Sequence, residues 1–171
     1  DMLAGRIVAD YAIIAGKALL IHGGDGGLDQ ALQRGMVEWT ELEITALYPK
    51  EEIAEQARQR LQKEKLAHRI ACRAGGIEQL PFEAESFDLV ADVGPVLIWT
   101  DRSKAMRELY RVLRRGGVAL VGGQYRHMPE FRRVSSETLR QDAASTGIQA
   151  IRVIDDMGQW VEIRKGIAAE K

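Results

Sequence analysis

Hydrophobic and polar positions divide the chain into two kinds of segment. Short runs that are apolar throughout are typical of strands buried on both faces, and longer runs with apolar residues every three or four positions are typical of amphipathic helices. The pattern predicts seven strands, with the sequences GKALLI (16–21), ELEITALY (41–48), HRIACRA (68–74), SFDLVADVG (86–94), GVALVGG (117–123), IQAIRVIDD (148–156) and QWVEIRK (159–165).

Helices are expected between most of these strands. They cover residues 2–13 and 28–33, a segment that starts at Pro49, and residues 102–113 and 130–145. In the helix after Pro49, Ile53, Ala57 and Leu61 are expected to share the buried face. Gly116 and Gly117 are expected to end the helix of 102–113.

Regular alternation of strands with helices predicts an α/β fold with a parallel sheet covered by helices. The two consecutive strands at the end of the chain indicate an antiparallel hairpin at one edge. The chain contains no repeat, low-complexity tract or linker, so a single domain over residues 1–171 is expected.

Composition narrows the class of protein. The 171 residues are 46% hydrophobic, and 24 basic against 25 acidic residues give a net charge of -1. The chain therefore has no excess of positive charge with which to bind nucleic acid or an anionic membrane surface. Cys72 is the only cysteine, which excludes an internal disulfide, and a buried strand position is expected for it. No apolar run approaches the ~20 residues of a membrane helix, so we expect a soluble, cytoplasmic protein.

The sequence HGGDGG (22–27) follows the first strand. Its glycines allow positive φ and close approach to a ligand, and the helix after it offers unpaired N–H groups. In parallel sheets, ligands bind beyond the carboxyl ends of the strands. A nucleotide site is therefore expected here, although a glycine turn alone is as often purely structural.

The segments IEQLPFEAESFDLV (77–90) and IWTDRSKAMRELYRVLRRGGVALVGG (98–123) closely resemble the class I S-adenosylmethionine-dependent methyltransferases. They share the Leu-Pro-Phe turn, the Ser-Phe-Asp strand and the Glu-x-x-Arg-Val-Leu-x-x-Gly-Gly segment of that family. The resemblance extends from about residue 7 to 165 and implies a Rossmann-like sheet of seven strands, mostly parallel with an antiparallel C-terminal strand and helices on both faces. It implies scaffold roles for Asp88 and Phe82, with solvated arginines in the helix of 102–113.

The resemblance also implies S-adenosylmethionine as the cofactor and locates its binding positions. These positions correspond to His22, Gly23, Gly24, Asp25, Gly26, Tyr48, Gly76, Ile77 and Asp92. The family's acidic residues would stand at Leu20, Tyr48 and Gly76, and His22 takes the place of the first glycine. Three lost carboxylates around one ligand indicate a degenerate site, in a protein that is weak or inactive as an enzyme and acts as a binding or partner subunit.

The alternative is an active methyltransferase of a small molecule that binds the cofactor in an altered way. Glu41 or Glu43 would approach the ribose if the register of the second strand were different, Asp25 could contact the cofactor through water, and Asp92 could act on a nucleophile. Trp99 lies either near the substrate mouth or in packing. No residue is assigned to catalysis, the three histidines lack metal-ligand spacing, and a protein partner or a second copy of the chain is the expected partner.

Overall fold

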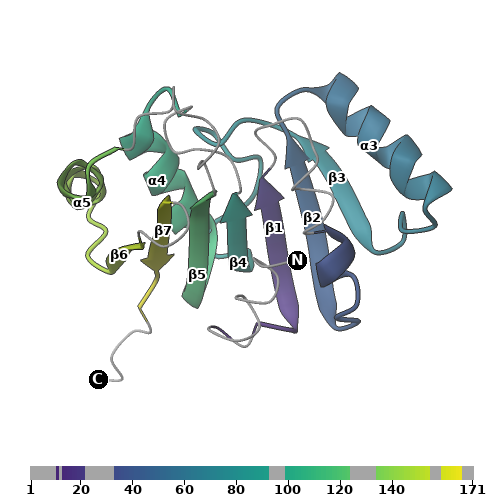
Figure 1. Ribbon diagram of the computed structural model, residues 1–171, viewed down its shortest axis with the longest axis horizontal. Coiled ribbons are helices and arrows are strands. Elements are labelled where there is room, and N and C mark those ends of the chain that lie inside the picture. Colours follow the sequence, from purple (N-terminus) through teal and green to yellow (C-terminus); the bar gives the residue numbers. More distant parts are fainter. Residues whose placement is uncertain are drawn as a thin grey trace.

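The computed structural model describes residues 11, 13–21, 33–92, 99–123, 134–154 and 159–166. Seven strands form one sheet in the order β3-β2-β1-β4-β5-β7-β6 (Figure 1). They are β1 (Gly16–Ile21), β2 (Leu42–Tyr48), β3 (Ile70–Ala74), β4 (Phe87–Asp92), β5 (Leu113–Gly123), β6 (Ile151–Ile154) and β7 (Gln159–Arg164). In this sheet β7 pairs antiparallel with β5 and β6, and the remaining pairs are parallel. The predicted fold class is confirmed.

Helices cover both faces of the sheet, as predicted. Helix α3 (Glu51–Lys63) lies over β2 and β3, and α4 (Arg102–Val112) and α5 (Ser136–Ser145) lie toward the opposite end of the sheet (Figure 1). Two apolar clusters result, and their buried members alternate along each central strand. The α3-side cluster includes Ala18, Leu20, Met36, Ala46, Tyr48 and Leu61, and the α4-side cluster includes Leu19, Ile21, Leu47, Val90, Trp99 and Leu109. Burial on both faces explains why these strands are apolar throughout.

The buried face of α3 differs from the prediction. Ala54, Ala57 and Leu61 are buried, whereas Ile53 is 39% exposed. The buried spacing of three and then four residues follows the helical period more closely than two steps of four, so the contact stripe passes through Ala54. The small side chain of Ala54 also lets α3 approach the strands.

The glycines expected to end α4 lie inside β5 instead. Helix α4 ends at Val112, and Leu113 is already extended. The pairing of β4 with β5 changes register between Phe87 and Leu89, and Gly116 has a φ of 81°. A Cβ at Gly117 would lie 2.9 Å from the carbonyl oxygen of Arg114. The two glycines therefore permit a bulge in β5.

The remaining helices were predicted with different limits. Helix α5 begins at Ser136, after Val134 and Ser135, because the Ser135 hydroxyl accepts a hydrogen bond from the N–H of Thr138. The first predicted helix lies outside the described residues except for Tyr11 and Ile13. Of the second, only Gln33 is described, and it is helical together with residues 34–36. The described helices contain none that is long and apolar enough to cross a membrane.

Two carboxylates hold distant parts of the sheet together. Asp88 accepts a hydrogen bond from the Lys17 N–H at 2.8 Å and one from Arg114 at 3.2 Å, which fits its expected structural role. On β7, the buried Glu162 accepts hydrogen bonds from Arg152 and Arg164, each at 2.9 Å, and from the hydroxyl of Tyr11. The bonds of Asp88 hold the start of β1, and those of Glu162 hold Tyr11 against the sheet.

Candidate functional site

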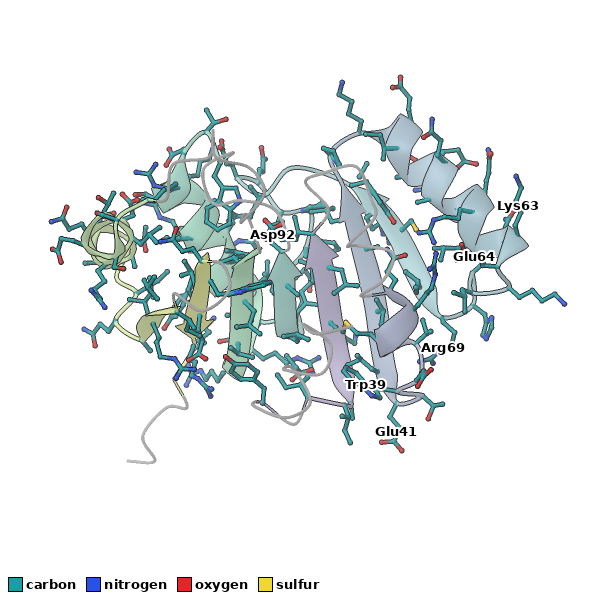
Figure 2. The ribbon with its side chains drawn as sticks, viewed as in Figure 1. Trp39, Glu41, Lys63, Glu64, Arg69 and Asp92 are labelled. Carbon is teal, nitrogen blue, oxygen red and sulfur yellow. The ribbon has the colours of Figure 1, made fainter. Side chains whose placement is uncertain are left out.

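The carboxyl ends of the parallel strands meet at one edge of the sheet, where the site was expected. Ile21 at the end of β1 is paired with Leu47 of β2 and with Asp92 of β4. Tyr48 ends β2 one residue beyond this pair. Figure 2 shows Asp92 at this edge and Glu41 at the opposite one. His22, Gly23, Gly24, Asp25 and Gly26 follow Ile21 directly and lie outside the described residues.

The register of β2 decides between two predicted positions for a ribose-binding acid. Glu43 is paired with Lys17 at the start of β1, and its carboxylate lies 3.8 Å from the Lys17 ammonium. Tyr48 lies five positions after Glu43, which is about 16 Å along a strand. The alternative in which Glu41 or Glu43 approaches the ribose is therefore wrong, and Tyr48 occupies the relevant end of the strand.

Tyr48 is turned into the interior of the protein. Its side chain belongs to the α3-side cluster and the residue is 7% exposed. Its hydroxyl oxygen accepts a hydrogen bond from the Gln33 amide at 3.0 Å. Burial raises the pKa of the Tyr48 phenol, and the nearby Gln33 amide and Arg60 guanidinium counteract this increase. The phenol is thus neutral, and its ring is packed in the interior at the position where the resemblance implies a carboxylate.

Leu20 is equally enclosed. It is 1% exposed, and its neighbours across the sheet are Ala46 and Ala91. A carboxylate in this position would lose its hydration within an apolar cluster. The surroundings of residue 20 are consequently those of a core leucine.

Gly76 is brought close to Tyr48, as the resemblance implies. The N–H of Gly75 donates a hydrogen bond to the carbonyl oxygen of Tyr48 at 2.9 Å. A Cβ at Gly76 would meet no atom of the described residues within 4 Å, whereas one at Gly75 would lie 2.9 Å from Pro81. Ile77 packs partly buried against the α4-side cluster. The described surroundings of Gly76 therefore leave space for a side chain.

Helix α4 holds the segment that contains these glycines. Arg111 donates hydrogen bonds to the carbonyl oxygens of Phe82 at 2.8 Å and Leu80 at 3.1 Å. Glu108 pairs with Arg111 at 2.7 Å and accepts a hydrogen bond from the Leu80 N–H at 2.8 Å. The prediction that the arginines of this helix are solvated is wrong for Arg111, because the turn beside it exposes carbonyl groups that need donors.

A second polar pair lies at the end of β4. Asp92 is 2% exposed, and the indole N–H of Trp99 donates a hydrogen bond to its carboxylate at 3.3 Å. Trp99 is itself buried in the α4-side cluster. Asp92 thus lies buried at the carboxyl edge of the sheet, hydrogen-bonded to the Trp99 indole.

The other candidate side chains do not assemble into a site. Among the described residues, no group of three His, Cys, Asp or Glu side chains could hold a metal ion. His68 is exposed, and His127 lies outside the described residues. Cys72 is buried as expected, and this burial raises the pKa of its thiol, so it stays protonated.

Comparison with known proteins matches this chain to methyltransferases. A methyltransferase domain family model matches residues 23–121. The chain is 39% identical over 54 residues to 2-methyl-6-phytyl-1,4-hydroquinone methyltransferase 2 of Oryza sativa subsp. japonica, covering 32% of this chain and 16% of that protein. It is 29% identical over 106 residues to a ubiquinone/menaquinone biosynthesis C-methyltransferase of Geotalea daltonii, covering 62% of this chain and 44% of that protein. The chain thus spans less than half of the length of either relative.

The fold has solved counterparts. A crystal structure from Methanococcus maripaludis, assigned to the S-adenosyl-L-methionine-dependent methyltransferases, superimposes with a TM-score of 0.82. It is 26% identical in sequence, and the match covers 98% of this chain and 85% of that one.

Proposed function

Because the chain belongs to the methyltransferase domain family, we propose that it keeps the family's scaffold with a degenerate S-adenosylmethionine site, which makes it weak or inactive as an enzyme. The observation that carries this proposal is Tyr48, which is buried at the end of β2 with its hydroxyl bonded to Gln33. Neither Tyr48 nor the enclosed Leu20 can offer a carboxylate to the cofactor. The described residues at these positions do not fit the family's mode of cofactor recognition.

The expected loss of affinity is large. A hydrogen bond to a charged group contributes about 1.5–3 kcal/mol, and a ribose-binding carboxylate normally makes two. Each 1.4 kcal/mol changes a dissociation constant about tenfold, so a micromolar site is expected to become about millimolar or weaker, allowing for non-additivity.

A domain of this kind would act by binding a protein partner or a second copy of itself. Sedimentation velocity of the purified chain tests for the second copy.

Replacement of Gly76 by aspartate tests the proposal through a gain of affinity. The site accepts a Cβ without contact, so the variant is expected to fold, and its carboxylate can accept a hydrogen bond from the adenine amino group. We expect S-adenosylhomocysteine to bind about tenfold or more tightly to Gly76→Asp than to the unmodified protein, measured by titration calorimetry.

Gly76→Ala is the matched control, because it adds the Cβ without the carboxylate. Its affinity is expected to equal that of the unmodified protein. Equal affinities for the aspartate and alanine variants would show that position 76 does not face the adenine. Only Leu20 and Tyr48 would then remain as positions where the cofactor site has lost an acid.

Asp92 favours a second candidate function, the active methyltransferase with an altered cofactor-binding mode. It is a buried carboxylate at the carboxyl edge of the sheet, bonded to the Trp99 indole, and a carboxylate so placed could position a substrate or remove its proton. The matched relatives are named as methyltransferases of hydroquinone and of quinone biosynthesis, which makes a small aromatic acceptor the substrate class to test. This candidate requires micromolar binding of the cofactor, and millimolar binding rejects it.

A further inference from the structure

We infer that hydrogen bonds linking Tyr48, Gln33, Arg60 and Glu64, here called the Tyr48 lock, hold the helical turn 33–36 against β2 and α3 without any ligand. Tyr48 is then a positioning residue for this turn. The inference rests on the proposed function, because the lock uses the position from which the family's acid binds the ribose. It goes further in giving the substituted tyrosine a task of its own.

The lock connects three separate parts of the chain. Gln33 donates its amide N–H to the Tyr48 hydroxyl at 3.0 Å, and its carbonyl oxygen accepts a hydrogen bond from Arg60 at 2.7 Å. Arg60 also pairs with Glu64 at 3.0 Å. Glu64 is labelled at the far end of α3 in Figure 2. Tyr48 at the end of β2 is thereby joined through Gln33 to the last turn of α3.

Within this arrangement, the buried side-chain amide of Gln33 would cost the most free energy if it lost its hydrogen bonds. Gln33 is 1% exposed, and a buried amide needs partners for both its oxygen and its nitrogen. Tyr48 and Arg60 supply one partner to each end of the amide. Because this fixes the orientation of the amide, the Tyr48 hydroxyl specifies the position of Gln33 in the helical segment 33–36.

The helical residues 33–36 have contacts on both sides of the lock. In this protein the N–H of Val37 bonds to the carbonyl oxygen of Gln33 at 3.0 Å, and Met36 is fully buried in the α3-side cluster. The apolar anchor at Met36 and the polar lock at Gln33 therefore hold this segment at two positions.

Hydrogen–deuterium exchange of the Val37 amide measures the lock, because this N–H is protected by its bond to Gln33. Tyr48→Phe keeps the buried ring and removes the hydroxyl, so it is expected to speed exchange at Val37 about three- to tenfold. Tyr110→Phe is the control: Tyr110 is half-buried in the α4-side cluster, and its replacement is expected to leave exchange at Val37 unchanged. Gln33→Met should give the same increase as Tyr48→Phe, and the double variant should add little more.

The outcomes separate the lock from the proposed function. Unchanged exchange at Val37 in Tyr48→Phe overturns the lock, whatever the cofactor affinity is. Slower exchange at Val37 when S-adenosylhomocysteine is added to the unmodified protein also overturns it, because the turn would then depend on the ligand. Faster exchange in Tyr48→Phe alone, together with no effect of S-adenosylhomocysteine, supports the lock. Micromolar binding of S-adenosylhomocysteine overturns the proposed function independently of these results.

Discussion

Replacement of Gly122 by alanine is expected to destabilise the protein by about 2–5 kcal/mol. Gly122 has a φ of 129°, and its Cβ would lie 2.1 Å from the carbonyl oxygen of Gln159. The positive φ costs an L-residue about 1–2 kcal/mol, and relief of the backbone contact requires β5 and β7 to move apart, at a further cost of about 1–3 kcal/mol. The loss is measured as a lower urea midpoint with an unchanged dependence on denaturant.

Two other glycines separate the two causes. Gly147 has a φ of 80°, and no atom in the described part of the chain lies within 4 Å of an added Cβ. Gly147→Ala is therefore expected to show only the conformational cost of about 1–2 kcal/mol. Gly76→Ala has neither a positive φ nor a contact and is expected to change stability by less than about 0.5 kcal/mol. If Gly122→Ala destabilised the protein no more than Gly147→Ala, the close antiparallel pairing of β5 with β7 would be wrong.

Arg111→Ala is expected to destabilise the protein by about 2–3 kcal/mol. The substitution removes the donors to the carbonyl oxygens of Leu80 and Phe82 and leaves the Glu108 carboxylate without its cation. Breaking a fully buried ion pair costs about 3–5 kcal/mol, and partial exposure of this pair reduces that figure. Arg107→Ala, an exposed position on the same helix, is the control and should fall within about 0.5 kcal/mol of the unmodified protein.

The pH dependence of this variant has a defined sign. The bond with Arg111 holds the pKa of Glu108 below its ordinary value, supported by the Leu80 N–H. Because the folded-state pKa is lowered, the stabilisation is complete above the ordinary pKa of about 4.3 and is lost as the pH falls through the folded-state value. The stability difference between the unmodified protein and Arg111→Ala should therefore narrow in acid. A difference that did not change with pH would contradict the role of the Glu108 charge.

The sequence predicted the sheet well because its central strands are buried on both faces. The run from Ala18 to Ile21 is uniformly apolar, and both apolar clusters use it in alternation. The prediction was wrong where tertiary contacts decide between neighbouring residues. The approach of α3 selected Ala54 over Ile53, and the bulge in β5 required the glycines that had been expected to end α4.

In the candidate site, too, the sequence predicted the location of residues better than their tertiary contacts. The resemblance to the family implies that Tyr48 and Gly76 lie near one another. In the structure, the N–H of Gly75, the residue before Gly76, is bonded to the carbonyl oxygen of Tyr48. The hydrogen bonds from Gln33 to Tyr48 and from Arg60 to Gln33 could not be predicted, because these residues come from distant parts of the sequence. The contacts of Arg111 were missed for a related reason, since a basic residue next to a buried helix stripe is usually solvated and nothing local identifies the carbonyl groups that it binds.

Titration calorimetry of S-adenosylhomocysteine with the unmodified protein tests the central claim most directly. A site without the acids at Leu20, Tyr48 and Gly76 is expected to bind with a dissociation constant of about 1 mM or weaker. A dissociation constant in the micromolar range would contradict the account and would indicate that the chain holds the cofactor through other groups.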